Sequence, residues 1–125
     1  VLEREAGKYD YSVLDIHAEA TSEKQAIANY FDGRINIIFG THTHVQTADE
    51  RILPKGSGYI TDLGMTGPLD SVLGIKTDII IEKFRTHMPT RFEIAEGALE
   101  LQGAVFTLGI NTGRAIEIKR LKIAL

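Results

Sequence analysis

Short apolar runs alternate with an amphipathic segment in the first part of the chain. The runs Tyr11–Ile16 and Ile35–Phe39 have the length and β-rich composition of buried strands. Between them, Ser22–Gln25 has the spacing of a helix capping box, and Gly33 is placed to end the helix. The apolar face of that helix would consist of Ala26, Ile27, Tyr30 and Phe31. This strand–helix–strand order predicts two parallel strands joined by a right-handed crossover.

The second part of the chain changes character. A third strand is predicted over Gly58–Leu63, and a short helix is predicted from Thr77, as its cap, to Arg85. The tail alternates apolar and polar residues in three stretches separated by turn signals: Arg91–Ala95, Ala98–Leu108 and Arg114–Ile123. We therefore predict an α/β fold in which parallel strands are followed by an antiparallel C-terminal meander.

The composition limits the classes of protein to which this chain can belong. The 125 residues are enough for one domain with a modest core, and 43% apolar with 25% charged residues is typical of a soluble globular protein. The net charge of −3 disfavours nucleic acid as an electrostatic partner. No apolar run approaches the ~20 residues of a membrane span, and the charged first ten residues do not form a signal peptide, so a cytoplasmic location is expected.

The chain has no cysteine, which limits the metals it could hold. Any metal must be bound by His, Asp, Glu or Asn, and this donor set suits Mn, Fe, Zn or Mg rather than a cysteine-bound structural zinc.

Three histidines follow the ends of two predicted strands. His17 comes directly after the first strand, and His42 and His44 come just after the second. Ligands bind outside the carboxyl ends of the strands in open α/β sheets, so neighbouring parallel strands would bring the three imidazoles to one edge. His42 and His44 are two residues apart, so in an extended segment their side chains point the same way. The pattern predicts a metal site, with structural histidines as the alternative. The fourth histidine, His87, is interpreted as a surface residue at a helix C-terminus.

Several carboxylates lie near these histidines in the sequence. Asp15 could orient an imidazole or bond to backbone at the strand end. Glu19 and Glu23 are interpreted as solvated residues at a helix start. Asp62 precedes the glycine-containing stretch Gly64–Pro68, which is either a close approach of backbone to a ligand or a tight turn.

Residues 14–24, 40–49 and 60–68 closely resemble the YmdB-like branch of the calcineurin-like metallophosphoesterases, and the resemblance extends over essentially the whole chain. It implies part of an αββα sandwich with a two-metal centre at the sheet edge. It also implies hydrolysis of phosphodiesters, 2′,3′-cyclic nucleotides among them. By the same motifs, His17 and His42 would bind one metal ion and His44 the other. The two ions would be divalent or transition metals, Fe, Mn, Zn or Mg.

The resemblance also implies what this chain lacks. The family's first metal-binding aspartate, its bridging acidic residue and its Asn-His pair lie in an N-terminal half that no stretch here matches. Val1–Ala6 reads as the middle of a helix without a cap, which likewise suggests a chain cut from a longer one. We therefore expect residues 1–125 to be the C-terminal part of a metallophosphoesterase domain, inactive alone and active when joined to its N-terminal half.

Two alternatives stay open from the sequence. The chain could be a non-enzymatic metal-binding or interaction module, including a homo-oligomer formed through an exposed sheet edge. The histidines could also be purely structural, with no metal bound.

Overall fold

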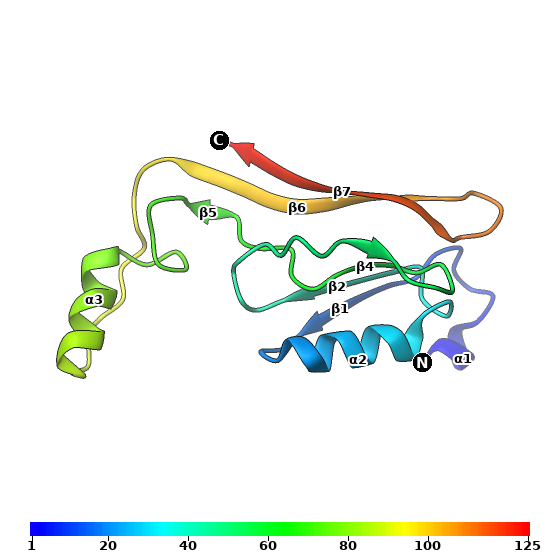
Figure 1. Ribbon diagram of the computed structural model, residues 1–125, viewed down its shortest axis with the longest axis horizontal. Helices are drawn as coiled ribbons and strands as arrows, with labels where there is room; N and C mark the ends of the chain where they lie inside the picture. Colours follow the sequence, from blue (N-terminus) through cyan, green and yellow to red (C-terminus); the bar gives the residue numbers. More distant parts are fainter.

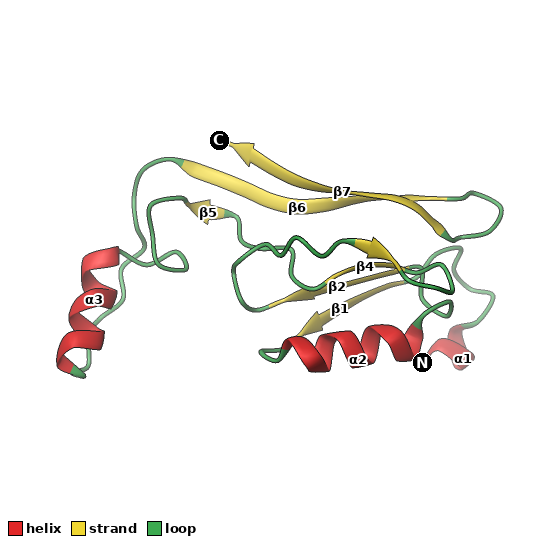
Figure 2. Cartoon of the chain, in the orientation of Figure 1, coloured by secondary structure: helices red, strands yellow, loops and turns green.

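The computed structural model describes all residues from Val1 to Leu125 and has three layers: one helix and two sheets (Figure 1). The first sheet has the strand order β1-β2-β4-β3. Its strands are β1 (Val13–His17), β2 (Ile37–Thr41), β3 (Arg51–Ile52) and β4 (Gly58–Ile60). Helix α2 (Thr21–Phe31) covers one face of this sheet, and the second sheet lies on the opposite side (Figure 2).

The parallel core predicted from the sequence is present. Strands β1 and β2 are parallel neighbours in a register that places Val13 opposite Ile37 and His17 opposite Thr41. Strand β4 is parallel to β2 on its other side, and β3 closes the sheet as an antiparallel edge strand. The carboxyl ends of β1 and β2 therefore meet at one edge, as the order of elements predicts.

The hydrophobic core lies between α2 and the first sheet. Its buried members come from the helix, the strands and the connecting segments: Ile16, Ala28, Ile35, Ile38, Leu53 and Tyr59. The predicted helix face is partly wrong, because Tyr30 is 69% exposed whereas Lys24 and Ala28 are the buried residues of α2. The helix presents a face that includes a charged side chain, and apolar periodicity alone does not identify such a face.

The second sheet is formed mainly by one long hairpin. Strands β6 (Leu99–Leu108) and β7 (Ala115–Ala124) pair antiparallel, and the short β5 (Gly67–Pro68) pairs with the start of β6. The two sheets approach closely at Gly58, where an added Cβ would lie 2.7 Å from the Phe106 ring. The resulting order of one α and two β layers is the part of an αββα sandwich that this chain forms.

Three local predictions are wrong. Arg91–Ala95 is not a strand: Ile94 makes only an isolated bridge to Ile75, and β5 is the third strand of the meander. Ser22 is not the cap of α2, since the helix begins at Thr21 and its preceding residue makes no side-chain cap bond. Thr77 likewise lies inside its helix rather than capping it. The alternating pattern of residues 91–95 lacks a continuous pairing partner. Helix α2 begins one residue before its predicted cap, and the helix predicted to follow Thr77 begins at Thr77 itself.

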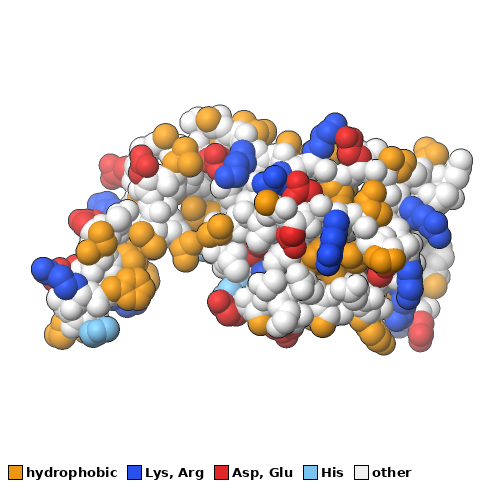
Figure 3. All heavy atoms as spheres, viewed as in Figure 1, with side chains coloured by type: hydrophobic (Ala, Val, Ile, Leu, Met, Phe, Trp, Pro, Cys, Tyr) orange, Lys and Arg blue, Asp and Glu red, His pale blue; other side chains and the backbone are white.

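Two further helices lie at opposite ends of the molecule (Figure 1). The four-residue α1 (Leu2–Glu5) lies near the start of β1, and its Leu2 packs against the core. Helix α3 (Thr77–Thr86) projects from the body and buries none of its residues. Hydrophobic side chains gather on the surface of this projection (Figure 3), among them Phe84, which is 72% exposed. None of these helices has the length and apolar character of a membrane span.

Candidate metal centre

Two of the three predicted ligands meet at the carboxyl edge of the first sheet. Strand β1 ends at His17, and His42 follows directly after the last residue of the paired strand β2. The two rings are nearly perpendicular, at 83°, with centroids 4.9 Å apart. His17 Nε2 and His42 Nδ1 are separated by 3.1 Å. Adjacent parallel strands thus produce the predicted convergence for this pair.

A short relay fixes the proton on His17. The Thr41 hydroxyl donates to Asp15 Oδ1 at 2.8 Å. Its single proton is thereby used, so it accepts a hydrogen bond from His17 Nδ1, 3.1 Å away. His17 therefore carries its proton on Nδ1 and directs the lone pair of Nε2 toward His42. Asp15 has the orienting role that the sequence suggested, acting through Thr41 rather than by direct contact.

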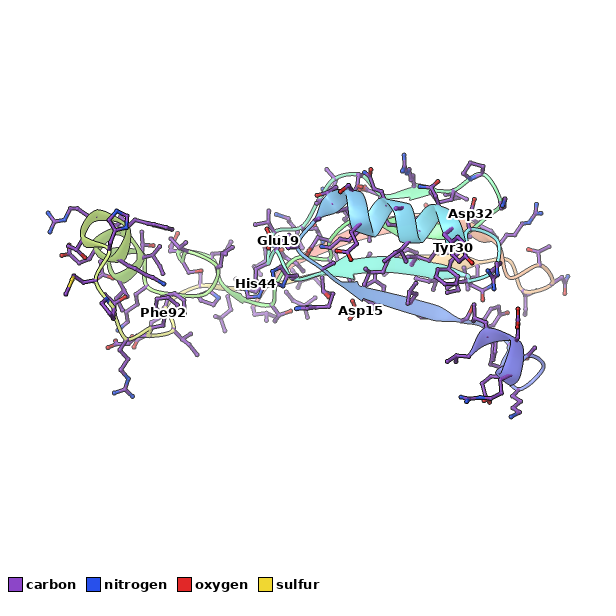
Figure 4. All side chains as sticks on the ribbon, turned by 90° about the horizontal axis from the view of Figure 1, so that it is seen from below. Asp15, Glu19, Tyr30, Asp32, His44 and Phe92 are labelled. Atoms are coloured by element: carbon purple, nitrogen blue, oxygen red, sulfur yellow. The ribbon has the colours of Figure 1, made fainter.

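Glu19 fixes the opposite ring in the same way. Its Oε2 lies 2.8 Å from His42 Nε2, and a carboxylate only accepts, so that nitrogen carries a proton. If His42 carries only this proton, the lone pair of its Nδ1 faces the lone pair of His17 Nε2. Two lone pairs 3.1 Å apart repel each other unless a proton or a cation lies between them. Figure 4 shows Glu19 and His44 at the end of the body that faces α3, with Asp15 farther along β1.

This arrangement fits a metal ion in its donor chemistry. Both nitrogens are neutral imidazole donors, and each ring donates its other N–H to an oxygen acceptor, as metal-bound histidines usually do. No group of three or more His, Asp or Glu side chains of this chain is arranged to hold one ion. The side chains of this chain alone therefore do not form a complete coordination shell.

His44 is directed elsewhere than predicted. Its Nδ1 lies 3.2 Å from the carbonyl oxygen of Leu73, in the segment that leads to α3. The expectation that His42 and His44 point the same way assumed extended backbone, but their φ angles are 108° and 62°. With both residues at positive φ, the two-residue alternation of a strand does not apply. His44 instead borders a cavity of about 190 Å³ that also includes Gln102 and Lys122 of the second sheet.

The fourth histidine behaves as predicted. His87 is exposed and occupies the C-cap of α3, where its φ is 56° and its backbone N–H donates to the Lys83 carbonyl. It takes no part in the centre.

A buried ion pair lies beneath the histidine loop, which we define as residues 40–44. Lys24 Nζ contacts Asp62 Oδ2 at 2.8 Å, and both side chains are fully buried. Asp62 also accepts the backbone N–H groups of Thr43 and Gly64, at 3.1 and 3.0 Å. Burial raises the pKa of Asp62, but the hydrogen bonds from Lys24, Gly64 and Thr43 outweigh it and hold that pKa below its usual value.

Sequence reasoning identifies only half of this pair. For Asp62 it leaves a tight turn and a ligand approach open, and the bond to Gly64 agrees with the turn. For Lys24 it indicates only a place in a capping box. The sequence does indicate that Lys24 lies on the buried face of the helix, because it precedes the small Ala28 by four residues and so shares its face.

A second carboxylate, Asp49, orders the segment that follows the histidine loop. It accepts hydrogen bonds from the hydroxyl of Thr47 and from the backbone N–H and hydroxyl of Thr61. Burial raises the pKa of Asp49, but these bonds more than compensate and lower it overall. Asp49 ends the family-like stretch 40–49, but the sequence did not predict its role, because its partner Thr61 lies twelve positions away at a strand end.

Comparisons with known proteins identify the family of this chain. The family model described as YmdB-like protein matches residues 1–121. The 2′,3′-cyclic-nucleotide 2′-phosphodiesterase of Bacillus subtilis (strain 168) is 52% identical over 118 residues, which are 94% of this chain and 45% of that protein. A crystal structure of a hypothetical protein from Thermus thermophilus has a TM-score of 0.89 and 40% identity, covering 98% of this chain and 49% of that one. A crystal structure of a novel phosphatase from Mycoplasma pneumoniae has a TM-score of 0.87 and 44% identity, covering 92% and 41%.

The mixed α/β fold, with one mainly parallel and one antiparallel sheet, is therefore of a class found in phosphatases. Within this class, the chain belongs to the YmdB-like protein family, as the sequence motifs predict. It spans less than half the length of the relatives it matches, between 41% and 49%.

Proposed function

We propose that this chain is the histidine-bearing part of a metal-dependent phosphodiesterase that acts on phosphodiesters such as 2′,3′-cyclic nucleotides. The observation that carries the proposal is the 3.1 Å approach of His17 Nε2 to His42 Nδ1, with the other nitrogen of each ring next to an oxygen atom, of Thr41 for His17 and of Glu19 for His42. The name of the Bacillus subtilis relative supports the reaction and the substrate class.

Some residues of this chain would bind the ions of a two-metal site, and others would orient the ligands. His17 and His42 would hold one ion, and His44 would contribute to the other from the border of the adjacent cavity. Such ions, Fe, Mn, Zn or Mg, clamp the phosphate and lower the pKa of a bound water. Asp15, through Thr41, would keep His17 in the tautomer whose Nε2 is free. Glu19 would do the same for His42.

The rest of the site would come from outside these 125 residues. Two histidines and a third at a distance leave most coordination positions open, since two-metal hydrolysis also needs acidic and bridging ligands. By the family resemblance, those ligands would lie in an N-terminal half, which we propose as the partner of this chain. The absence of cysteine agrees with a cytoplasmic setting for such a site.

Metal binding tests the first step. In calorimetric titrations with Zn²⁺, we expect the 125-residue chain to bind weakly, because it provides only neutral ligands. His17→Ala, His42→Ala or His44→Ala should each lower that affinity about tenfold or more, the scale on which changes at metal sites act. His87→Ala is the matched control and should bind as the wild type does. Equal affinity in all four variants would contradict the proposal.

A binding module without catalysis is the second candidate. It is favoured by one observation, that no group of three ligating side chains exists in this chain. A full-length relative that binds metal at all of its ligands yet hydrolyses no phosphodiester would support it.

A further inference from the structure

We propose that the buried ion pair of Lys24 and Asp62 positions the histidine loop, holding His42 and His44 in the conformation that faces the metal ions. The inference rests on the proposed metal-dependent function and adds two positioning residues to it. Neither side chain reaches the centre itself, since both are fully buried beneath the loop.

The path of Lys24 shows that the loop is built around this pair. The side chain starts from α2 and crosses beneath Gly40, the first residue of the loop, to reach Asp62. A Cβ at Gly40 would lie 2.7 Å from Lys24 Cδ and would overlap the carbonyl oxygen of Thr61. Only glycine leaves room here for both the lysine stem and the neighbouring strand. Glycine is therefore needed at this position because of the space around it, and not because of its backbone angles.

The contact with Thr43 connects the pair to the ligands. Asp62 Oδ2 accepts the Thr43 N–H at 3.1 Å, between His42 and His44 in the sequence. Those histidines have φ angles of 108° and 62°, in a region that non-glycine residues seldom adopt. Such a conformation persists only where the surrounding structure holds it. The hydrogen bond from Thr43 is placed to do so, because it fixes the peptide plane that joins His42 to Thr43, between the two histidines.

Stability alone is a weak reason for this ion pair. Replacing a buried pair with apolar residues of similar volume is often neutral or stabilising, because desolvation offsets the attraction. An apolar pair would not, however, accept the N–H groups of Thr43 and Gly64. Lys24 in turn keeps Asp62 ionised, so that both carboxylate oxygens remain acceptors.

Two double variants test the proposal without any metal. Lys24→Met/Asp62→Asn removes both charges. Thr43 and Gly64 bond different oxygens of Asp62, so one of their amides would face the NH2 donor of the asparagine and lose its hydrogen bond. Lys24→Met/Asp62→Leu removes both acceptors. The readouts are amide hydrogen exchange at these two residues and long-range ¹H–¹⁵N spectra, which show the ring nitrogen that carries the proton in His42.

In folded variants, judged by circular dichroism, at least one of the two amides should exchange about tenfold faster, the effect expected for one lost bond to a charged group. The fixed His42 tautomer should be replaced by the mixture seen in free imidazole. Ile38→Val is the control, because it weakens the fully buried core without touching the loop, and it should leave both readouts unchanged. Wild-type exchange and tautomers in either folded double variant would overturn the proposal.

Zinc titration of the same variants links positioning to function. Their affinity should fall about tenfold, as for other residues that orient metal ligands. An unchanged affinity would show that the pair does not serve the metal site. A wild-type chain that binds no zinc would overturn the proposed function, while the metal-free spectra would still decide whether the pair positions the loop.

Discussion

At the residue scale, the chemistry of this protein depends on which nitrogen of each histidine carries a proton. Asp15, Thr41 and Glu19 assign these protons so that two lone pairs face each other. None of the three is a candidate ligand in its own right, and each acts through a ring that it orients. The carboxylates that orient loops, Asp49 and Asp62, have lowered pKa values for the same reason: they accept several hydrogen bonds in the folded state.

Acid sensitivity follows from Asp49. Its folded pKa lies below the unfolded value of about 3.9, so its contribution to stability is complete above that pH and is lost as the pH falls through the lower folded value. Asp49→Asn should lower the free energy of unfolding at pH 7 by about 1–2 kcal/mol, since it removes hydrogen bonds to a charged group.

Urea unfolding from pH 7 down to pH 2 measures this effect. The difference between wild type and Asp49→Asn should shrink with falling pH, because protonation removes the same charge in the wild type. Asp10→Asn, at an exposed position with no side-chain bond, is the control and should stay within about 0.5 kcal/mol of wild type. A difference that stays constant or grows toward pH 2 would contradict the assignment.

At the scale of elements, the molecule divides into a packed body and a projecting arm, which is the segment between Ile75 and Ile94 that contains α3. Strand β2 pairs on both sides and contains Ile38, which is fully buried. Helix α3 buries no residue, and its apolar side chains Ile81 and Phe84 are largely exposed. The arm is held by the bridge between Ile75 and Ile94, and the Phe92 labelled on it in Figure 4 packs under Lys83 within the arm itself.

This division predicts unequal local stability. In hydrogen exchange of the 125-residue chain, the amides of α3 should exchange at rates set by local opening, because few apolar contacts oppose it. The amides of β2 should exchange only through global unfolding. Ala28, buried in α2, provides a matched helical control and should be protected like β2. Protection of α3 equal to that of α2 would show that something covers the arm, such as a second copy of the chain.

At the scale of the whole molecule, one helix layer and two sheets place the histidines at a sheet edge without completing a site. The chain spans 45% of the Bacillus subtilis phosphodiesterase it matches. Strand β1, which ends at His17, has a neighbour on one side only, and its Val13 is 59% exposed. Further strands could pair with that free edge and bring ligands toward His17.

Catalysis tests this arrangement. We expect the 125-residue chain alone to show no hydrolysis of 2′,3′-cyclic AMP above background with added Mn²⁺, because a loosely held ion cannot both activate water and clamp the phosphate. Joined to the proposed N-terminal half, it should hydrolyse this substrate or bis-para-nitrophenyl phosphate. His17→Ala, His42→Ala or His44→Ala should abolish turnover with the fold retained. Robust activity of the 125-residue chain, lost on chelation, would show that its own residues complete the site.

The sequence by itself determined that the first two strands are parallel neighbours, that the C-terminal strands are antiparallel, and that His17 and His42 follow adjoining strand ends. These features follow from local periodicity and from the rule that parallel strands end at one edge. The same motifs were sufficient to predict the family.

Only the tertiary structure decided the rest. It placed β5 rather than Arg91–Ala95 in the second sheet, because strand pairing depends on a distant partner and not on alternation alone. It turned His44 away from His42 through positive φ angles that no spacing encodes. It buried Lys24, because burial of a charge requires an opposite charge, and that charge lies 38 residues away on Asp62.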